Sequence, residues 1–92
     1  MLGLDIHALA RQPLSREDVT TVLERLLPGE EIPIRPDDGN EELKFCLIIS
    51  KIQRTLPLDG MIERRSIPHP NGITNYYKVS RDTFEKIKNL RL

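Results

Sequence analysis

The chain has 92 residues, one cysteine and a formal net charge of zero, and it contains no Trp and only two Phe and two Tyr. This length allows one domain with a core of Leu, Ile and Val, while the lone Cys46 excludes an internal disulfide and a cysteine-built zinc site. No apolar run approaches the roughly 20 residues that span a bilayer, and the first residues lack the pattern of a secretory signal, so the composition indicates a cytoplasmic protein without a membrane segment.

Two helices are predicted in the first 28 residues. The second begins after Ser15, whose hydroxyl can accept a hydrogen bond from the Asp18 N–H in a capping box, and it ends at Pro28-Gly29. Its apolar stripe consists of Val19, Val22, Leu23, Leu26 and Leu27. The first helix is short and ends before Pro13, and its apolar residues are Leu4, Ile6, Leu9 and Ala10.

A loop and a third helix follow. Residues 28–40 carry three prolines and many acids, which predicts an exposed, mobile loop. At most residues 31–35 form a short strand there, and Pro33 confines it to a sheet edge. The third helix is predicted over residues 41–55, with Asn40 as its cap and Pro57 after its end. It is the most apolar of the helices, with Phe45, Ile48, Ile49, Ile52 and Leu56 at helical spacing.

The last third of the chain predicts a β-hairpin and a final helix. Residues 61–67 and 73–79 alternate in polarity on either side of a turn closed at Asn71-Gly72. The alternation places Tyr77 in the core, and Ser80 caps the last helix. The whole order predicts a small α+β domain over residues 1–92, in which helices pack on a C-terminal hairpin that leads into a final helix.

Within this order, residues 49–80 resemble the winged helix-turn-helix family of DNA-binding regulators. Ile49-Ser50-Lys51 matches the V-S-R of the family's recognition helix, and Gly60-Met61-Ile62 matches the G-L-I that follows it. Arg64-Arg65 matches the basic pair on the first wing strand, and residues 68–72 match the wing tip. The resemblance implies a winged-helix-like domain in which the hairpin is the wing.

The chain departs from the family pattern at three places, one of which is Pro57, because it shortens the recognition helix. Gln53 occupies a position where the family prefers an apolar residue, and residues 28–40 replace the tight turn between the two core helices. The function that the resemblance implies is duplex DNA binding by a small transcriptional regulator, working as a dimer.

The charge distribution favours an anionic partner. Residues 1–43 hold four arginines against ten acidic residues, a net charge of −6, and residues 44–92 carry the opposite charge of +6. In the resemblance Arg64 and Arg65 clamp phosphates, and the helix and the wing tip supply the other contacts. The candidate DNA-binding residues are Lys44, Ser50, Lys51, Arg54, Arg64, Arg65, His69, Asn71 and Lys78.

A second hypothesis is a protein-interaction module on the same scaffold, within a larger assembly or as a homodimer. The zero net charge and the acidic loop favour it, because the acidic half can dock on a basic surface. An enzyme is not indicated, since no pattern brings a histidine to Cys46. The acidic run at residues 37–42 lacks the spacing of a calcium-binding loop, so neither a metal nor a cofactor is expected.

Overall fold

The computed structural model describes residues 6–56 and 60–92, so Leu4 and Pro57 lie outside the described residues. Within these described residues, four α-helices, one 3-10 helix and three strands follow one another. They are α1 (Ile6–Arg11), α2 (Arg16–Arg25), β1 (Ile32–Ile34), η1 (Pro36–Asp38), α3 (Asn40–Thr55), β2 (Glu63–His69), β3 (Gly72–Lys78) and α4 (Arg81–Lys88). The predicted α+β order is confirmed.

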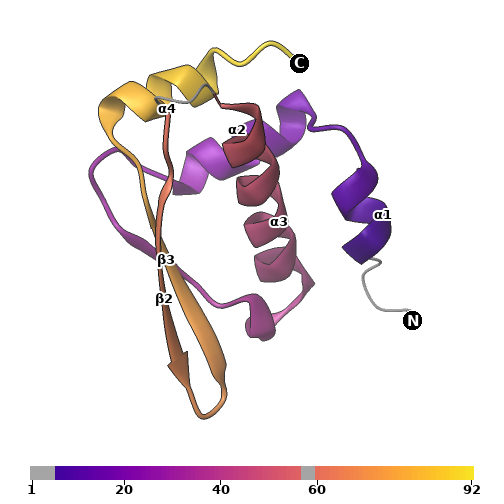
Figure 1. Cartoon of the computed structure of the whole chain (residues 1–92), viewed down its shortest axis with the longest axis vertical. Coiled ribbons are helices and arrows are strands. Elements are labelled where there is room, and N and C mark those ends of the chain that lie inside the picture. Colours follow the sequence, from indigo (N-terminus) through magenta and orange to yellow (C-terminus); the bar gives the residue numbers. More distant parts are fainter. Residues whose placement is uncertain (1–5, 57–59) are drawn as a thin grey trace.

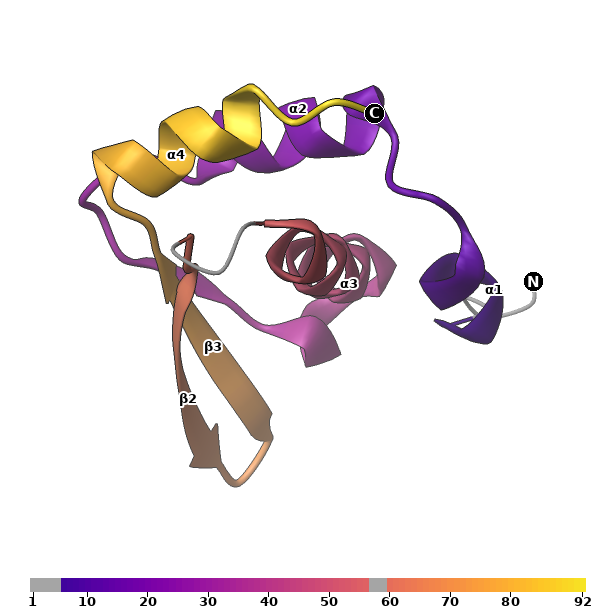
Figure 2. The ribbon, with the colours of Figure 1, turned by 45° about the horizontal axis from the view of Figure 1, so that its top comes forward.

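The helix α3 lies at the centre of the molecule. The helices α2 and α4 lie side by side over it, and α1 contacts it from another side (Figure 2). The hairpin of β2 and β3 extends away from the helices (Figure 1). The buried core draws on α2, β1, α3, β3, α4 and the segments beside them: it contains Val19, Val22, Leu26, Ile34, Phe45, Ile48, Ile49, Ile52, Leu56, Ile62, Tyr77, Val79 and Ile87. The prediction that Tyr77 is a core residue is confirmed.

The three strands form one antiparallel sheet in the order β1-β3-β2. The strand β1 contains Pro33 and lies at one edge, as predicted. The expectation that residues 28–40 are exposed is wrong for Ile34, whose side chain is 0% exposed. Ile34 pairs with Asn75 on the face of the sheet that packs against the helices, so this segment contributes to the core.

The strand β2 forms the other edge of the sheet. Six of its seven residues are exposed, and the seventh, His69, is half-buried. Its register with β3 runs from Glu63 opposite Lys78 to His69 opposite Gly72. The hairpin predicted from alternation is therefore confirmed.

The hairpin turn lies one residue earlier than predicted. His69 and Gly72 still pair, so the connecting residues are Pro70 and Asn71. Gly72 has φ of 138°, and a Cβ at this position would overlap the Asp37 carboxylate. That carboxylate accepts a hydrogen bond from the Ile73 N–H at 3.2 Å. The close approach of Asp37 in η1, which is distant in sequence, thus requires a glycine at position 72. This glycine is the first residue of β3 and does not belong to the turn.

Two of the three predicted helix caps are confirmed. Ser15 Oγ accepts from the Asp18 N–H, and Ser80 Oγ accepts from the Thr83 N–H, both at 3.1 Å. The prediction for Asn40 is wrong, because Asn40 is already helical and the Leu43 N–H bonds to the Gly39 carbonyl. None of the helices in the described part of the chain has the length and apolar content that crossing a membrane requires.

Candidate nucleic-acid interface

Two sets of contacts connect the hairpin to α3. In the middle of the hairpin, Asn75 Nδ2 lies 3.7 Å from Cys46 Sγ on α3, and Asn75 Oδ1 accepts from Ser66 Oγ on β2 at 2.6 Å. At the hairpin base, Gln53 Oε1 accepts from the Ile62 N–H at 2.7 Å. Residues between Cys46 and Gln53 therefore lie beside residues between Ile62 and Ser66.

These contacts place Ser50 and Arg64 at similar heights along the helix and the strand. Ser50 is four residues after Cys46, a rise of about 6 Å along a helix, and Arg64 is two residues before Ser66, about 6.6 Å along a strand. Arg54 follows Ser50 by one helical turn and is also exposed. Arg64 pairs in register with the buried Tyr77, so it lies on the face of the hairpin that looks toward α3. We call Ser50, Arg54 and Arg64 the helix–wing face.

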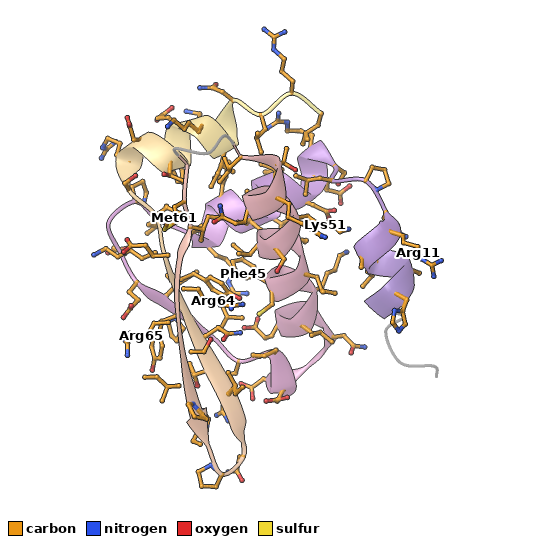
Figure 3. All side chains as sticks on the ribbon, in the orientation of Figure 1. Arg11, Phe45, Lys51, Met61, Arg64 and Arg65 are labelled. Atoms are coloured by element: carbon orange, nitrogen blue, oxygen red, sulfur yellow. The ribbon has the colours of Figure 1, made fainter. Side chains whose placement is uncertain are left out.

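Arg64 and Arg65 lie on opposite faces of β2, as neighbouring strand residues must. Figure 3 shows Arg64 on the side of α3 and Arg65 on the outer side of the hairpin. Arg65 Nη2 donates to Glu31 Oε1 at 2.8 Å, and its guanidinium lies 4.5 Å from the centre of the Tyr76 ring. Arg64 and Arg65 therefore do not share a face of the hairpin, and Arg65 is already paired with a carboxylate; their contact with phosphates stays a prediction.

The Arg65–Glu31 pair leads to a titration prediction. The hydrogen bond from Arg65 lowers the pKa of Glu31 below its ordinary value, so Arg65→Ala is expected to raise this pKa again, measured from the carboxyl carbon shift across pH. The pair stabilises the fold above the unfolded pKa of Glu31, and that contribution is lost as pH falls through the lowered folded pKa. Because both side chains are exposed, the contribution is small. Arg64→Ala is the matched control and should leave Glu31 unchanged; an equal shift in both variants would contradict the pairing.

The prediction that Lys51 is an exposed groove residue is wrong, since Lys51 is only 8% exposed. Its spacing of seven from Lys44 does place the two lysines on one face of α3, but that face looks toward α1 and the start of α2. Figure 3 shows Lys51 on this side of α3, away from Arg64. Packing by α1 therefore separates Lys44 and Lys51 from the helix–wing face.

The remaining predicted residues lie on the hairpin. His69 is half-buried, and its Nε2 lies 2.8 Å from Thr74 Oγ1, which ties the ring to β3. Asn71 is exposed in the turn. Lys78 is exposed at the hairpin base, opposite Glu63 and close enough to Glu31 to lower the pKa of that carboxyl. Lys78 thus lies among acids on the outer face, together with Arg65.

Two polar residues that sequence reasoning did not assign a role hold the hairpin base in place. Besides accepting from Ile62, Gln53 donates through Nε2 to the Gly60 carbonyl at 3.3 Å. Thr83 on α4 is 4% exposed, and its Oγ1 accepts from the Met61 N–H at 3.5 Å. The sequence did draw attention to Gln53, because it is polar at a position where the family pattern is apolar. Its side chain bonds the backbone at the base of the hairpin.

No three His, Cys, Asp or Glu side chains gather as a metal site among residues 6–56 and 60–92. No family model matches the chain, and no match was found among curated proteins or among solved structures.

Proposed function

We propose that this protein binds the phosphate backbone of duplex DNA through the helix–wing face. The observation that carries the proposal is the placement of Arg64. It lies on the hairpin face that carries the buried Tyr77, and it forms no ion pair with a described acidic residue, whereas its neighbour Arg65 is paired on the opposite face. A cation that is held on a braced strand without a counter-charge is suited to an external phosphate.

The hairpin is held firmly enough to act as a wing. Asp37 on η1 bonds the Ile73 N–H near its tip, and Gln53 and Thr83 bond its base. These contacts fix the hairpin against η1 at its tip and against α3 and α4 at its base, so binding of a duplex by Arg64 needs no reordering of the hairpin. Ser50 is exposed on the same helix, one turn before Arg54, and its hydroxyl donates to the Cys46 carbonyl at 3.2 Å.

Salt dependence tests the proposal. Two phosphate contacts, from Arg54 and Arg64, predict a slope of log K against log salt of about −1.8 per bound chain, since each contact contributes ~0.9. Fluorescence anisotropy with a mixed-sequence duplex measures this slope. Arg64→Ala is expected to reduce it by ~0.9, and Arg65→Ala is expected to leave it unchanged.

The two arginines are matched neighbours of equal charge, so the comparison removes the effect of net charge. Equal losses in both variants would mean that DNA responds to overall charge and not to the helix–wing face. Absence of any binding near about 50 mM salt, where electrostatic binding is strong, would refute DNA binding altogether.

A second candidate function rests on the open edge of β2. A strand with unpaired backbone groups along an exposed edge can accept an extended segment of another protein, which makes the domain an interaction module. This candidate is favoured if wild-type protein does not bind DNA at low salt while amide exchange along residues 63–69 slows when a protein partner is added.

A further inference from the structure

The backbone groups of β2 alternate in direction, and one contact fixes which of them face the open edge. In an antiparallel ladder, pairs that exchange two backbone bonds alternate with pairs whose N–H and C=O groups point away from each other. The Ile73 N–H donates to the Asp37 carboxylate, and its partner Pro68 has no N–H, so this pair is of the second kind. Two and four residues earlier on β2, Ser66 and Arg64 therefore also point their backbone groups away from β3.

No described residue bonds these outward groups. The strand β2 is the last in the sheet order, and outside the ladder no hydrogen bond joins the N–H of Arg64 or Ser66 to the described part of the chain. The edge thus offers two N–H groups, from Arg64 and Ser66, and the C=O groups of Arg64, Ser66 and Pro68. An extended chain antiparallel to β2 can exchange two bonds with each of the first two residues and donate one to Pro68.

The side chains along the edge select the composition of such a chain. Residues directly opposite each other in an antiparallel pair have Cβ atoms about 5 Å apart. Arg64 forms no ion pair with a described acidic residue, so a carboxylate opposite it completes a cross-strand ion pair. Toward the hairpin tip, Ile67 is 39% exposed, and Ile73 beside Pro68 is 42% exposed. Apolar side chains opposite Ile67 and Pro68 remove this surface from water.

We propose that the open edge of β2 binds an extended segment of a partner protein, antiparallel to β2, with apolar residues opposite Pro68 and Ile67 and a carboxylate opposite Arg64. The proposal rests on the interaction module that is the second candidate function, and it adds the direction, the register and the composition of the partner. The residue opposite Glu63 is basic or neutral, because like charges directly opposite each other destabilise a strand pair.

A six-residue peptide tests the proposal by nuclear magnetic resonance titration of the 92-residue chain. The probe, acetyl-Val-Ile-Thr-Thr-Glu-Lys amide, places its valine opposite Pro68, its glutamate opposite Arg64 and its lysine opposite Glu63. The amide signals of residues 63–67 are expected to shift saturably at millimolar peptide, and exchange of the Arg64 and Ser66 amides is expected to slow. The titration contains no DNA, so its result does not depend on DNA binding.

Methylation of the peptide backbone tests the hydrogen-bonding phase. The N–H of the first threonine lies opposite Ser66 and points at β2, whereas the N–H of the second threonine points away from β2. An N-methyl group on the first threonine is expected to weaken binding at least about tenfold, because a backbone bond is lost and the methyl group contacts the strand. The same group on the second threonine is the matched control, with identical composition, and should leave the affinity unchanged.

Exchange of the peptide's glutamate for glutamine tests the register. In the wild type this exchange is expected to weaken binding by up to about fivefold, the effect of an exposed ion pair. In Arg64→Ala the two peptides are expected to bind equally. Arg65→Ala is the matched protein variant and should discriminate between them as the wild type does, since Arg65 lies on the opposite face and pairs with Glu31.

Several outcomes would overturn the proposal. Equal affinities of the two methylated peptides would mean that the segment does not pair with β2 in this phase. A preference for glutamate that persists in Arg64→Ala would place the carboxylate elsewhere. Equally tight binding of a scrambled peptide would leave the interaction module in place but refute the register and the composition. Signals of residues 63–67 that shift with protein concentration alone would make a second copy of the chain the occupant of the edge.

Discussion

Replacing Ile34 with alanine is expected to lower the free energy of unfolding by about 3 kcal/mol, because the substitution leaves a cavity in a fully buried site. A chain of this length has a total stability of roughly 5–14 kcal/mol, so the loss is a large fraction of the whole. Urea denaturation should show a midpoint lower by about 1–3 M, from slopes of about 1–3 kcal/mol per molar urea.

Ile67→Ala on β2 is the matched control. Ile67 is 39% exposed, so the same loss of side-chain atoms should cost less than about 1 kcal/mol. Similar losses of unfolding free energy at both positions would mean that β1 does not bury Ile34 in the core in solution. The comparison therefore measures how much the short edge strand contributes to the fold.

Replacing Gln53 with leucine is expected to destabilise the protein by about 2–3 kcal/mol. The variant removes the bonds to the Ile62 N–H and the Gly60 carbonyl. Both residues are buried, and a buried donor or acceptor without a partner loses its full desolvation energy. Resemblance to the winged helix-turn-helix family predicts the opposite sign, since that family prefers an apolar residue here.

Gln53→Glu distinguishes the two bonds. The carboxylate keeps an acceptor for the Ile62 N–H but loses the donor to the Gly60 carbonyl, so its stability should lie between those of the wild type and Gln53→Leu. Amide exchange at Ile62 should accelerate in Gln53→Leu and much less in Gln53→Glu. A Gln53→Leu variant at least as stable as the wild type would contradict the bracing role.

The elements of this fold could be predicted because their signals are local. The caps at Ser15 and Ser80 are decided by residues three positions away. The hairpin is predicted by the alternation of polar and apolar residues in the two segments that flank a turn. The burial of α3 follows from the spacing of its apolar residues.

The errors arise where distant segments meet. Lys51 has the sequence neighbourhood of an exposed helical residue, but α1 covers it. Arg65 is neutralised by Glu31, which is 34 residues away in the chain. The turn shifts by one residue because Asp37 approaches Gly72. Each of these contacts depends on tertiary packing, which no short window of sequence specifies.

For the candidate interface, the sequence indicated Ser50, Arg54 and Arg64 among nine residues but gave no reason to prefer them. The selection comes from the alignment of α3 with β2 through Asn75 and Gln53. A basic residue becomes a candidate contact only when its face is known, and the face is set by the register of the sheet.

The open edge of β2 has a consequence for crowded conditions. An unpaired strand is a template on which further chains can add, leading to fibrous aggregates. Here Glu63, Arg64 and Arg65 place charges along that edge, and Pro68 removes a donor from it. Such residues act as gatekeepers against aggregation. The charged residues of β2 thus protect the exposed edge of the sheet from pairing with copies of the same chain.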